Sequence, residues 1–208
     1  MTELESDWFS LCEQAGIVAA TGHSLLQTLF IGYHTPYRAY HNLNHIAACL
    51  QLAQPYLNQT TDPVAVQLAI WYHDLIYDTK ASDNEHQSAQ VAYQALQLAG
   101  VADDLVDEVS RLILTTQTHQ AEADDRNAHL LLDVDLAILG AAAPLYQQYA
   151  QAIRQEYHWV SDEAYRQGRG RVLQQFLQRP RLYFTEPYTI QFEVQARTNI
   201  QQEIETLI

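Results

Sequence analysis

The stretch TDPVAVQLAIWYHDLIYD, Thr61 to Asp78, is the most hydrophobic segment of the chain and decides the fold class. Asp62 is a favoured N-cap residue and Pro63 suits the first helical position, so a helix is predicted to begin here. Apolar side chains cover nearly all sides of this helix, which predicts a place at the centre of the core. His73 and Asp74 interrupt the apolar run, and a buried helix alone does not explain them.

The rest of the chain also repeats its apolar residues at helical spacing, and strand-like alternation is nearly absent. Breakers are few, with 7 Gly and 6 Pro in 208 residues. We therefore predict an all-α, single-domain helical bundle over residues 1–208, with a core part at about 38–140 and C-terminal helices at about 141–208. The further helices are predicted at about residues 3–16, 24–34, 42–57, 83–100, 102–119, 130–140, 144–160, 162–178 and 190–207.

The charge of the chain limits its partners. Eleven basic residues stand against 25 acidic ones, for a net charge of −14. A surface this acidic repels nucleic acid polymers, although a metal ion or a few arginines can still attract a small phosphorylated molecule. Seven of the ten arginines lie from Arg154 onward, which fits salt bridges to acidic groups or, alternatively, a polyanion patch.

Cysteine content and hydropathy predict a cytoplasmic protein. Cys12 and Cys49 cannot build a disulfide framework, so a reducing compartment is expected. The acidic N-terminus does not resemble a signal peptide. No apolar run approaches the roughly 20 residues that span a bilayer, so no membrane is expected as a partner. A homodimer through the terminal helices is left open.

Polar side chains intrude on the predicted apolar faces at four places, and together they suggest a metal site. Burying an isolated carboxylate is costly unless it is paired, hydrogen-bonded or bound to a metal. Imidazole nitrogens and carboxylate oxygens are ligands that divalent ions accept, and bundles commonly gather them from several helices. The four places are His41 with His45, His73 with Asp74, Thr115 and Thr116 with His119, and Asp133 with Asp135.

Helical geometry restricts which of these side chains can share an ion. His41 and His45 are one turn apart and could lie on one face. His73 and Asp74 are adjacent, so in a regular helix they diverge by about 100° and the ion must sit between them. Asp133 and Asp135 diverge by about 200°, so only one of the two can point at the ion.

The ordered set His45, His73-Asp74 and Asp135 resembles the H…HD…D signature of the HD-domain superfamily of metal-dependent phosphohydrolases. The segment YHNLNHI at residues 40–46 is similar to the YHNxxHA signature of cyclic-nucleotide phosphodiesterases, and NEHQSA at 84–89 to a glutamate-bearing segment of many members. The resemblance implies one divalent ion (Mn, Mg, Co, Ni, Zn or Fe) held by His45, His73, Asp74 and Asp135. Asp133 would then face solvent or support a ligand.

The resemblance also implies roles around the ion. His41 matches the histidine that protonates the leaving oxygen. Asp74 could accept a proton from water while it remains a ligand, and Glu85 could orient a ligand or the leaving group. Arg38 and Lys80 are candidates to bind a phosphate, and His119 to contact the substrate or a second ion.

Three functions fit these residues. The leading prediction is an enzyme, a phosphohydrolase acting on a small phosphate ester, with a nucleotide as the first candidate. A regulatory module that binds a metal or nucleotide without turnover is the second. The third is a diiron oxygenase of the same superfamily, which needs more ligands than this quartet. The phosphodiesterases' HPG histidine is missing after Tyr77, so a cyclic nucleotide is not specifically indicated.

Overall fold

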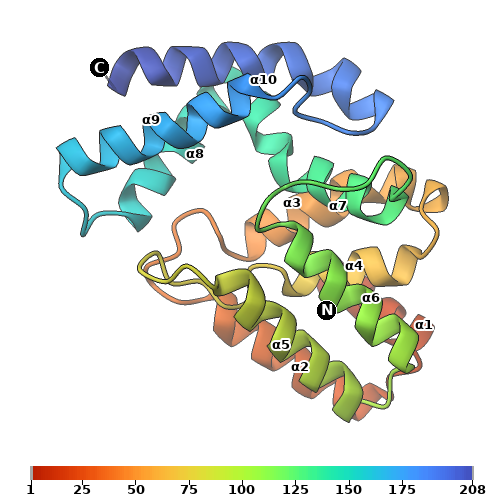
Figure 1. Cartoon of the computed structure of the whole chain (residues 1–208). Coiled ribbons are helices and arrows are strands. Elements are labelled where there is room, and N and C mark those ends of the chain that lie inside the picture. The colour runs from red at the N-terminus through yellow and green to blue at the C-terminus, as the bar shows by residue number, and fades with distance from the viewer. Residues whose placement is uncertain (1, 208) are drawn as a thin grey trace. The chain divides into compact units, whose positions relative to one another are not determined.

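The computed structural model describes residues 2–207, and within this range the chain forms ten α-helices and two short 3₁₀ helices but no strand (Figure 1). The predicted all-α fold is confirmed. In chain order the helices are α1 (Glu3–Gln14), α2 (Ala19–Tyr33), α3 (Leu43–Ala53), η1 (Gln54–Gln59), α4 (Pro63–Tyr72), α5 (Asn84–Leu98), α6 (Asp103–Thr115), α7 (Arg126–Leu136), η2 (Ala137–Gly140), α8 (Ala143–Glu156), α9 (Asp162–Gln178) and α10 (Glu186–Leu207).

The helices divide into two compact units, the first ending at Leu131 and the second beginning at Leu132. Unit 1 contains α1 to α6 and the first part of α7, and unit 2 contains the last turn of α7 and everything after it. The division thus falls inside one helix. The single domain predicted for residues 1–208 stays a prediction.

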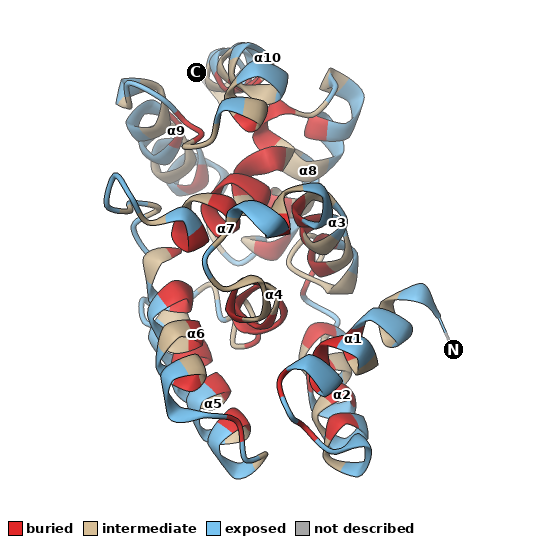
Figure 2. Cartoon of the chain, turned by 90° about the vertical axis from the view of Figure 1, so that its right-hand side faces the viewer, coloured by how far each residue is buried: buried red, intermediate tan, exposed pale blue. Residues whose placement is uncertain are grey.

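Helix α4 is the centre of unit 1, as its sequence predicts. The Asp62 carboxylate accepts hydrogen bonds from the backbone N–H of Val64 (3.1 Å) and Ala65 (2.9 Å), so the N-terminus is capped as expected. Helices α1, α3, α5 and α6 all pack against α4. Its side chains are buried on nearly every face, as the red colouring of α4 in Figure 2 shows.

The end of α4 differs from the prediction. The apolar pattern continues to Tyr77, but the helix stops at Tyr72, and His73 is its C-cap residue. Residues 73–74 form a turn and residues 75–76 a bend, and the Leu75 N–H donates to the Tyr72 carbonyl at 3.0 Å. His73 keeps a right-handed helical backbone (φ −58°, ψ −37°), so His73 and Asp74 lie in a tighter turn at the end of the helix.

The first part of α7 is tied to the start of α4 within unit 1. The buried Asn127 side chain accepts hydrogen bonds from the backbone N–H of Thr61 (2.9 Å) and Asp62 (3.1 Å), and from the Thr61 hydroxyl (3.0 Å). Its amide donates to Glu108 on α6 at 2.8 Å. One amide group therefore fixes where α7 begins relative to two helices of the core.

Unit 2 is organised around α10, which packs on η2 and α9. The Asp133 carboxylate is fully buried and accepts hydrogen bonds from the backbone N–H of Phe184 (2.6 Å) and Thr185 (2.8 Å) and from the Thr185 hydroxyl (2.6 Å). The alternative that Asp133 faces solvent was wrong, because its carboxylate is buried and hydrogen-bonded by donors more than 50 positions away in sequence, whereas the alternative that it supports a ligand stays a prediction. Asp133 anchors the segment that leads into α10.

Three of the seven arginines from Arg154 onward form ion pairs inside unit 2. Arg169 donates to both oxygens of the buried Glu203 at 2.8 and 3.1 Å, and Arg197 donates to Glu193 at 2.7 Å. Arg154 pairs with Asp162 at 2.6 Å. For these three arginines the salt-bridge interpretation is confirmed, and their charge is already balanced by a carboxylate.

No single helix among residues 2–207 is long and apolar enough to cross a membrane, although one bent pair, residues 126–140 with 143–156, meets the test of length and composition.

Two glycines of unit 2 provide a matched test of this packing. A Cβ on Gly140 would lie 2.5 Å from Phe192 Cβ and 2.7 Å from the Phe192 carbonyl oxygen, whereas a Cβ on Gly168 inside α9 would meet nothing within 4 Å. We expect Gly140→Ala to lower the free energy of unfolding by about 1–3 kcal/mol through overpacking. Gly168→Ala should raise it by about 0.5–1 kcal/mol, because alanine favours the helix. Denaturant unfolding measures both, and equal stability of the two variants would contradict the α10–η2 packing.

Candidate metal centre

The first candidate ligand, His45, is positioned by the start of α3. The side chain of Asn42 caps this helix by accepting a hydrogen bond from the backbone N–H of Asn44 at 2.9 Å. The helix therefore begins at Leu43, and His45 lies in its first turn with only 5% of its surface exposed. His41 precedes the cap and lies outside the helix, so the expectation that His41 and His45 share a helical face was wrong.

The second candidate ligand, His73, is oriented by the last turn of α4. Its Nδ1 atom lies 2.9 Å from the carbonyl oxygen of Ile70. A carbonyl can only accept, so Nδ1 carries the proton and donates, and the lone pair of the neutral ring is on Nε2. Hydrogen bonds of this kind fix the ring of a metal-binding histidine and its tautomer. His73 is 2% exposed, so water does not compete for this arrangement.

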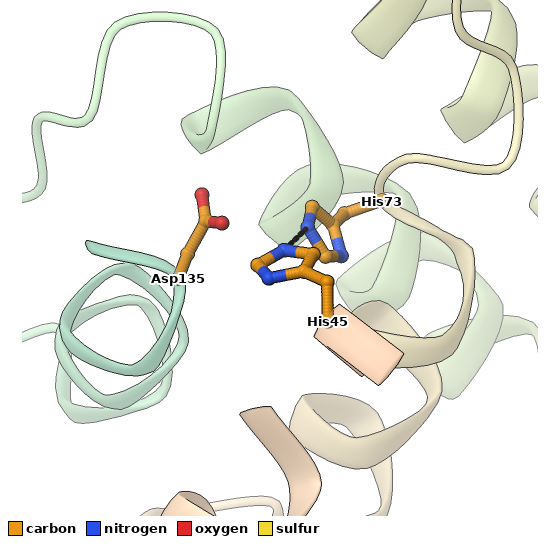
Figure 3. A group of neighbouring side chains, drawn as sticks. All are labelled: His45, His73 and Asp135. Atoms are coloured by element: carbon orange, nitrogen blue, oxygen red, sulfur yellow. Dashed lines mark hydrogen bonds between the residues drawn. The ribbon is translucent and has the colours of Figure 1, made fainter. Parts of the chain in front are cut away.

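Three donor atoms of unit 1 converge on one point. His45 Nε2 lies 3.3 Å from His73 Nε2, the contact that Figure 3 marks with a dashed line. Asp74 Oδ2 lies 3.2 Å from His73 Nε2 and 3.7 Å from His45 Nε2. An ion with four tetrahedral ligands at about 2.0–2.2 Å separates neighbouring ligand atoms by about 3.3–3.6 Å. The triangle of donors therefore has the dimensions of one face of such a coordination sphere.

The charges of these atoms favour a cation at the same point. The Nε2 lone pair of neutral His73 faces a carboxylate oxygen and a second imidazole nitrogen, in surroundings that exclude most water. Lone pairs this close repel one another unless a proton or a metal ion lies between them. Two imidazole nitrogens and a carboxylate oxygen are a donor set that divalent transition metals accept. The residues present thus fit a divalent ion.

Asp135 is a further candidate ligand on the last turn of α7, drawn with the two histidines in Figure 3. His45 and His73 belong to unit 1, and Asp135 is counted with unit 2. Its predicted role as a ligand therefore stays a prediction.

Two further side chains lie beside His45 in the cluster. Cys49, one turn after His45 on α3, is buried with its sulfur 3.7 Å from His45 Nδ1 and 3.8 Å from His45 Nε2. The ring of Tyr40 lies 4.9 Å from that of His45. The spacing of four residues between His45 and Cys49 was a readable signal, because such residues lie on one helical face.

The candidate proton donor His41 lies beside the cluster. Its ring centroid is 6.0 Å from that of His45 and 4.3 Å from that of Tyr77, and the side chain is half-buried. His41 is thus next to the ligands without being part of the triangle. This position suits a group that acts on a bound molecule, and its catalytic role stays a prediction.

The other predicted residues lie on the surrounding loops and helix ends. Arg38 is buried and bonded to backbone oxygens, whereas Lys80 is exposed in the loop between α4 and α5. Glu85 is half-buried in the first turn of α5. His119 follows α6 in a left-handed conformation, with a φ of 48° that is uncommon for a residue with a side chain. The positions of Lys80, Glu85 and His119 do not test their catalytic or substrate-binding roles, which stay predictions.

Comparisons with known proteins find no match to a family model, a curated protein or a solved structure. The assignment of the site therefore rests on its own geometry.

A metal ion should stabilise the folded chain through these donors. With free Zn²⁺ or Co²⁺ about 100-fold above its dissociation constant, binding adds about 2.7 kcal/mol, which raises the melting temperature of a chain this long by about 5–10 °C. Thermal unfolding with and without metal measures the shift. His73→Ala should abolish it, whereas His158→Ala, at an exposed histidine after α8, should leave it unchanged. A shift that survives in His73→Ala would place the ion elsewhere.

Proposed function

We propose that this chain is a metal-dependent phosphohydrolase that cleaves a small phosphate ester with water. The observation that carries the proposal is the convergence of His45 Nε2, His73 Nε2 and Asp74 Oδ2 within 3.7 Å of one another. Three ligands from one side leave the opposite side of an ion open for water and a phosphoryl oxygen. The resemblance of the ordered residues to the HD-domain superfamily points to the same chemistry.

A divalent ion held there would lower the pKa of a coordinated water to about 7 and offset negative charge on the phosphoryl group. The chain's own groups would do the rest. Asp74 is half-buried beside the ligand nitrogens and could accept the proton of the attacking water. His41, on the rim of the cluster, would donate a proton to the leaving oxygen. Glu85 would orient a ligand or the leaving group.

The helix α7 supports Asp135 as a further ligand. Its first part is fixed in unit 1 by the hydrogen bonds of Asn127, and Leu131 is fully buried there. Asp135 follows Leu131 by four residues on the same helix and is the residue that the resemblance to the HD-domain superfamily gives as a ligand. A carboxylate from this helix would balance the second charge of a divalent ion.

The substrate would be a small phosphorylated molecule, with a nucleotide as the first candidate. The net charge of −14 disfavours a nucleic acid polymer, so attraction for phosphate has to be local to the ion. Lys80 in its exposed loop and His119 after α6 are the side chains proposed to contact the substrate. Tyr77, whose ring centroid lies 4.3 Å from that of His41 at a tilt of 32°, is the aromatic side chain proposed to pack against a base.

Two other functions use the same residues. A regulatory module would bind the metal, or a nucleotide, without turnover, and would need no proton donor at the position of His41. A diiron oxygenase would need a second set of ligands, and the triangle in unit 1 supplies donors for one ion. Metal content separates the three, since about one ion per chain with ester hydrolysis supports the phosphohydrolase and two irons with oxygen-dependent activity support the oxygenase.

The roles of the residues predict a split between metal content and turnover. His73→Ala and Asp74→Ala should each lose the ion and all hydrolysis, because they remove a ligand from a three-membered cluster. His41→Ala should keep about one ion per chain and lose turnover by about 100-fold or more, the usual contribution of a positioned general acid. Elemental analysis of the dialysed proteins gives the metal content.

Turnover is measured by phosphate release from mono-, di- and cyclic nucleotides and from simple phosphate monoesters, with Mn, Mg, Co, Ni, Zn and Fe supplied separately. His86→Ala serves as the control, because His86 is exposed on α5. Equal metal loss in His41→Ala and His73→Ala would contradict the assigned roles. A fully metal-loaded chain that hydrolyses none of these esters would favour the regulatory module.

A further inference from the structure

Arg38 is a buried cation of unit 1, and three of its four hydrogen-bond partners are backbone oxygens. Its Nη1 donates to the carbonyl oxygens of His41 (3.0 Å) and Asp74 (2.6 Å), and its Nη2 donates to that of Leu75 (2.7 Å). Its Nε donates to the Thr35 hydroxyl at 3.0 Å. We infer that Arg38 is a positioning residue that holds the ligand-bearing turn after α4 against the loop that carries His41. This inference rests on the proposed metal site and deepens it.

The end of α4 explains why a cation is needed here. The last carbonyl groups of a helix have no partner within the helix and carry partial negative charge. At this end the Tyr33 hydroxyl donates to the Trp71 carbonyl at 3.0 Å, and Arg38 takes the carbonyls of Asp74 and Leu75 just beyond. Burial raises the pKa of the Tyr33 phenol well above its ordinary value, so it remains a neutral donor. The two side chains together terminate α4 and shape the turn that presents His73 and Asp74.

Arg38 is also linked to His41 through contacts with aromatic rings. Its guanidinium carbon lies 5.1 Å from the ring centroid of Tyr33 and 5.4 Å from that of Tyr77, within the range of cation–π attraction. Tyr77 in turn stacks on the His41 ring at 4.3 Å. The backbone of His41 and the ring against which it packs are therefore both held by one guanidinium.

These bonds do not suit the phosphate-binding role that the sequence suggested for Arg38. Four of its five N–H donors are used, and the residue is only 7% exposed. A planar fork of fixed donors can join three carbonyl oxygens at once, whereas a lysine ammonium has three donors around a single point. Lysine at this position would keep the charge and lose the geometry.

The consequence for the site is a dependence of metal affinity on Arg38, although Arg38 is no ligand. Outer groups that orient ligands typically contribute 10–100-fold to metal affinity, because small displacements of a ligand weaken the bond. The side chain of Asp74 starts from a backbone whose carbonyl Arg38 holds at 2.6 Å. Releasing that carbonyl should let Asp74 and His73 drift apart.

The test compares Arg38→Lys with Arg111→Lys by titration with Co²⁺ and Zn²⁺. Arg111 is a matched control, since it also joins two segments of unit 1 through paired N–H donors, but its partners are the carboxylates of Glu108 and Asp125. We expect Arg38→Lys to bind metal at least about 10-fold more weakly, and Arg111→Lys to stay within about twofold of the original chain. Thermal unfolding without metal shows how much stability each variant has lost.

Two further readouts separate positioning from a general loss of stability. In the metal-free protein, amide hydrogen exchange over residues 73–77 should be faster in Arg38→Lys than in the original chain, and unchanged in Arg111→Lys. Thr35→Val, which removes only the partner of Nε, should fold and give a smaller loss of metal affinity. Unchanged metal affinity and unchanged exchange in Arg38→Lys, or in Thr35→Val should the lysine variant not fold, would overturn the inference.

The test of Arg38 does not depend on whether the chain hydrolyses a phosphate ester. If the original chain binds one ion but hydrolyses no phosphate ester, the proposed function fails while the comparison of metal affinities still decides the role of Arg38. If hydrolysis is found and Arg38→Lys binds metal normally, the proposed function stands and the positioning role falls.

Discussion

The end of helix α4 at Tyr72 is the constraint on which the site depends. Helix α4 ends at Tyr72, and in the turn that follows the His73 imidazole and the Asp74 carboxylate come within 3.2 Å, with His45 Nε2 3.3 Å from His73 Nε2. The same break leaves backbone carbonyls without helical partners, and a buried arginine and a tyrosine satisfy them. The turn after α4 therefore both ends the helix and presents two of the candidate ligands.

Local sequence signals were sufficient to predict where several of the helices begin and end. Asp62 and Pro63 start α4 where they predict it, and the predicted bounds of α9 are those observed. Gly16 and Gly100 end their helices with φ values of 74° and 80°, which glycine adopts without strain. Each of these features depends on residues within a turn or two of one another, so a single sequence is enough to read it.

Features that depend on contacts between residues far apart in the sequence could not be predicted from it. The apolar pattern of α4 runs on to Tyr77, and it is Arg38, more than 30 positions earlier, that satisfies the carbonyls of the turn. The burial of Asp133 could not be predicted, because its hydrogen-bond donors lie in the segment before α10. The division of the chain inside α7 has no signal of its own, since the helix is continuous there. The candidate ligands could be identified because burying a carboxylate or an imidazole among apolar residues costs free energy unless the group is paired, hydrogen-bonded or bound to a metal.

The central claim is that one divalent ion binds the nitrogens of His45 and His73 together with Asp74. X-ray absorption spectroscopy of the zinc-loaded protein tests it most directly, because imidazole ligands give a distinctive pattern of scattering from their outer ring atoms. We predict one zinc per chain, with two imidazole nitrogens and oxygen ligands at about 2.0–2.2 Å. A bound zinc without imidazole scattering, or a chain that retains no zinc, would contradict the account.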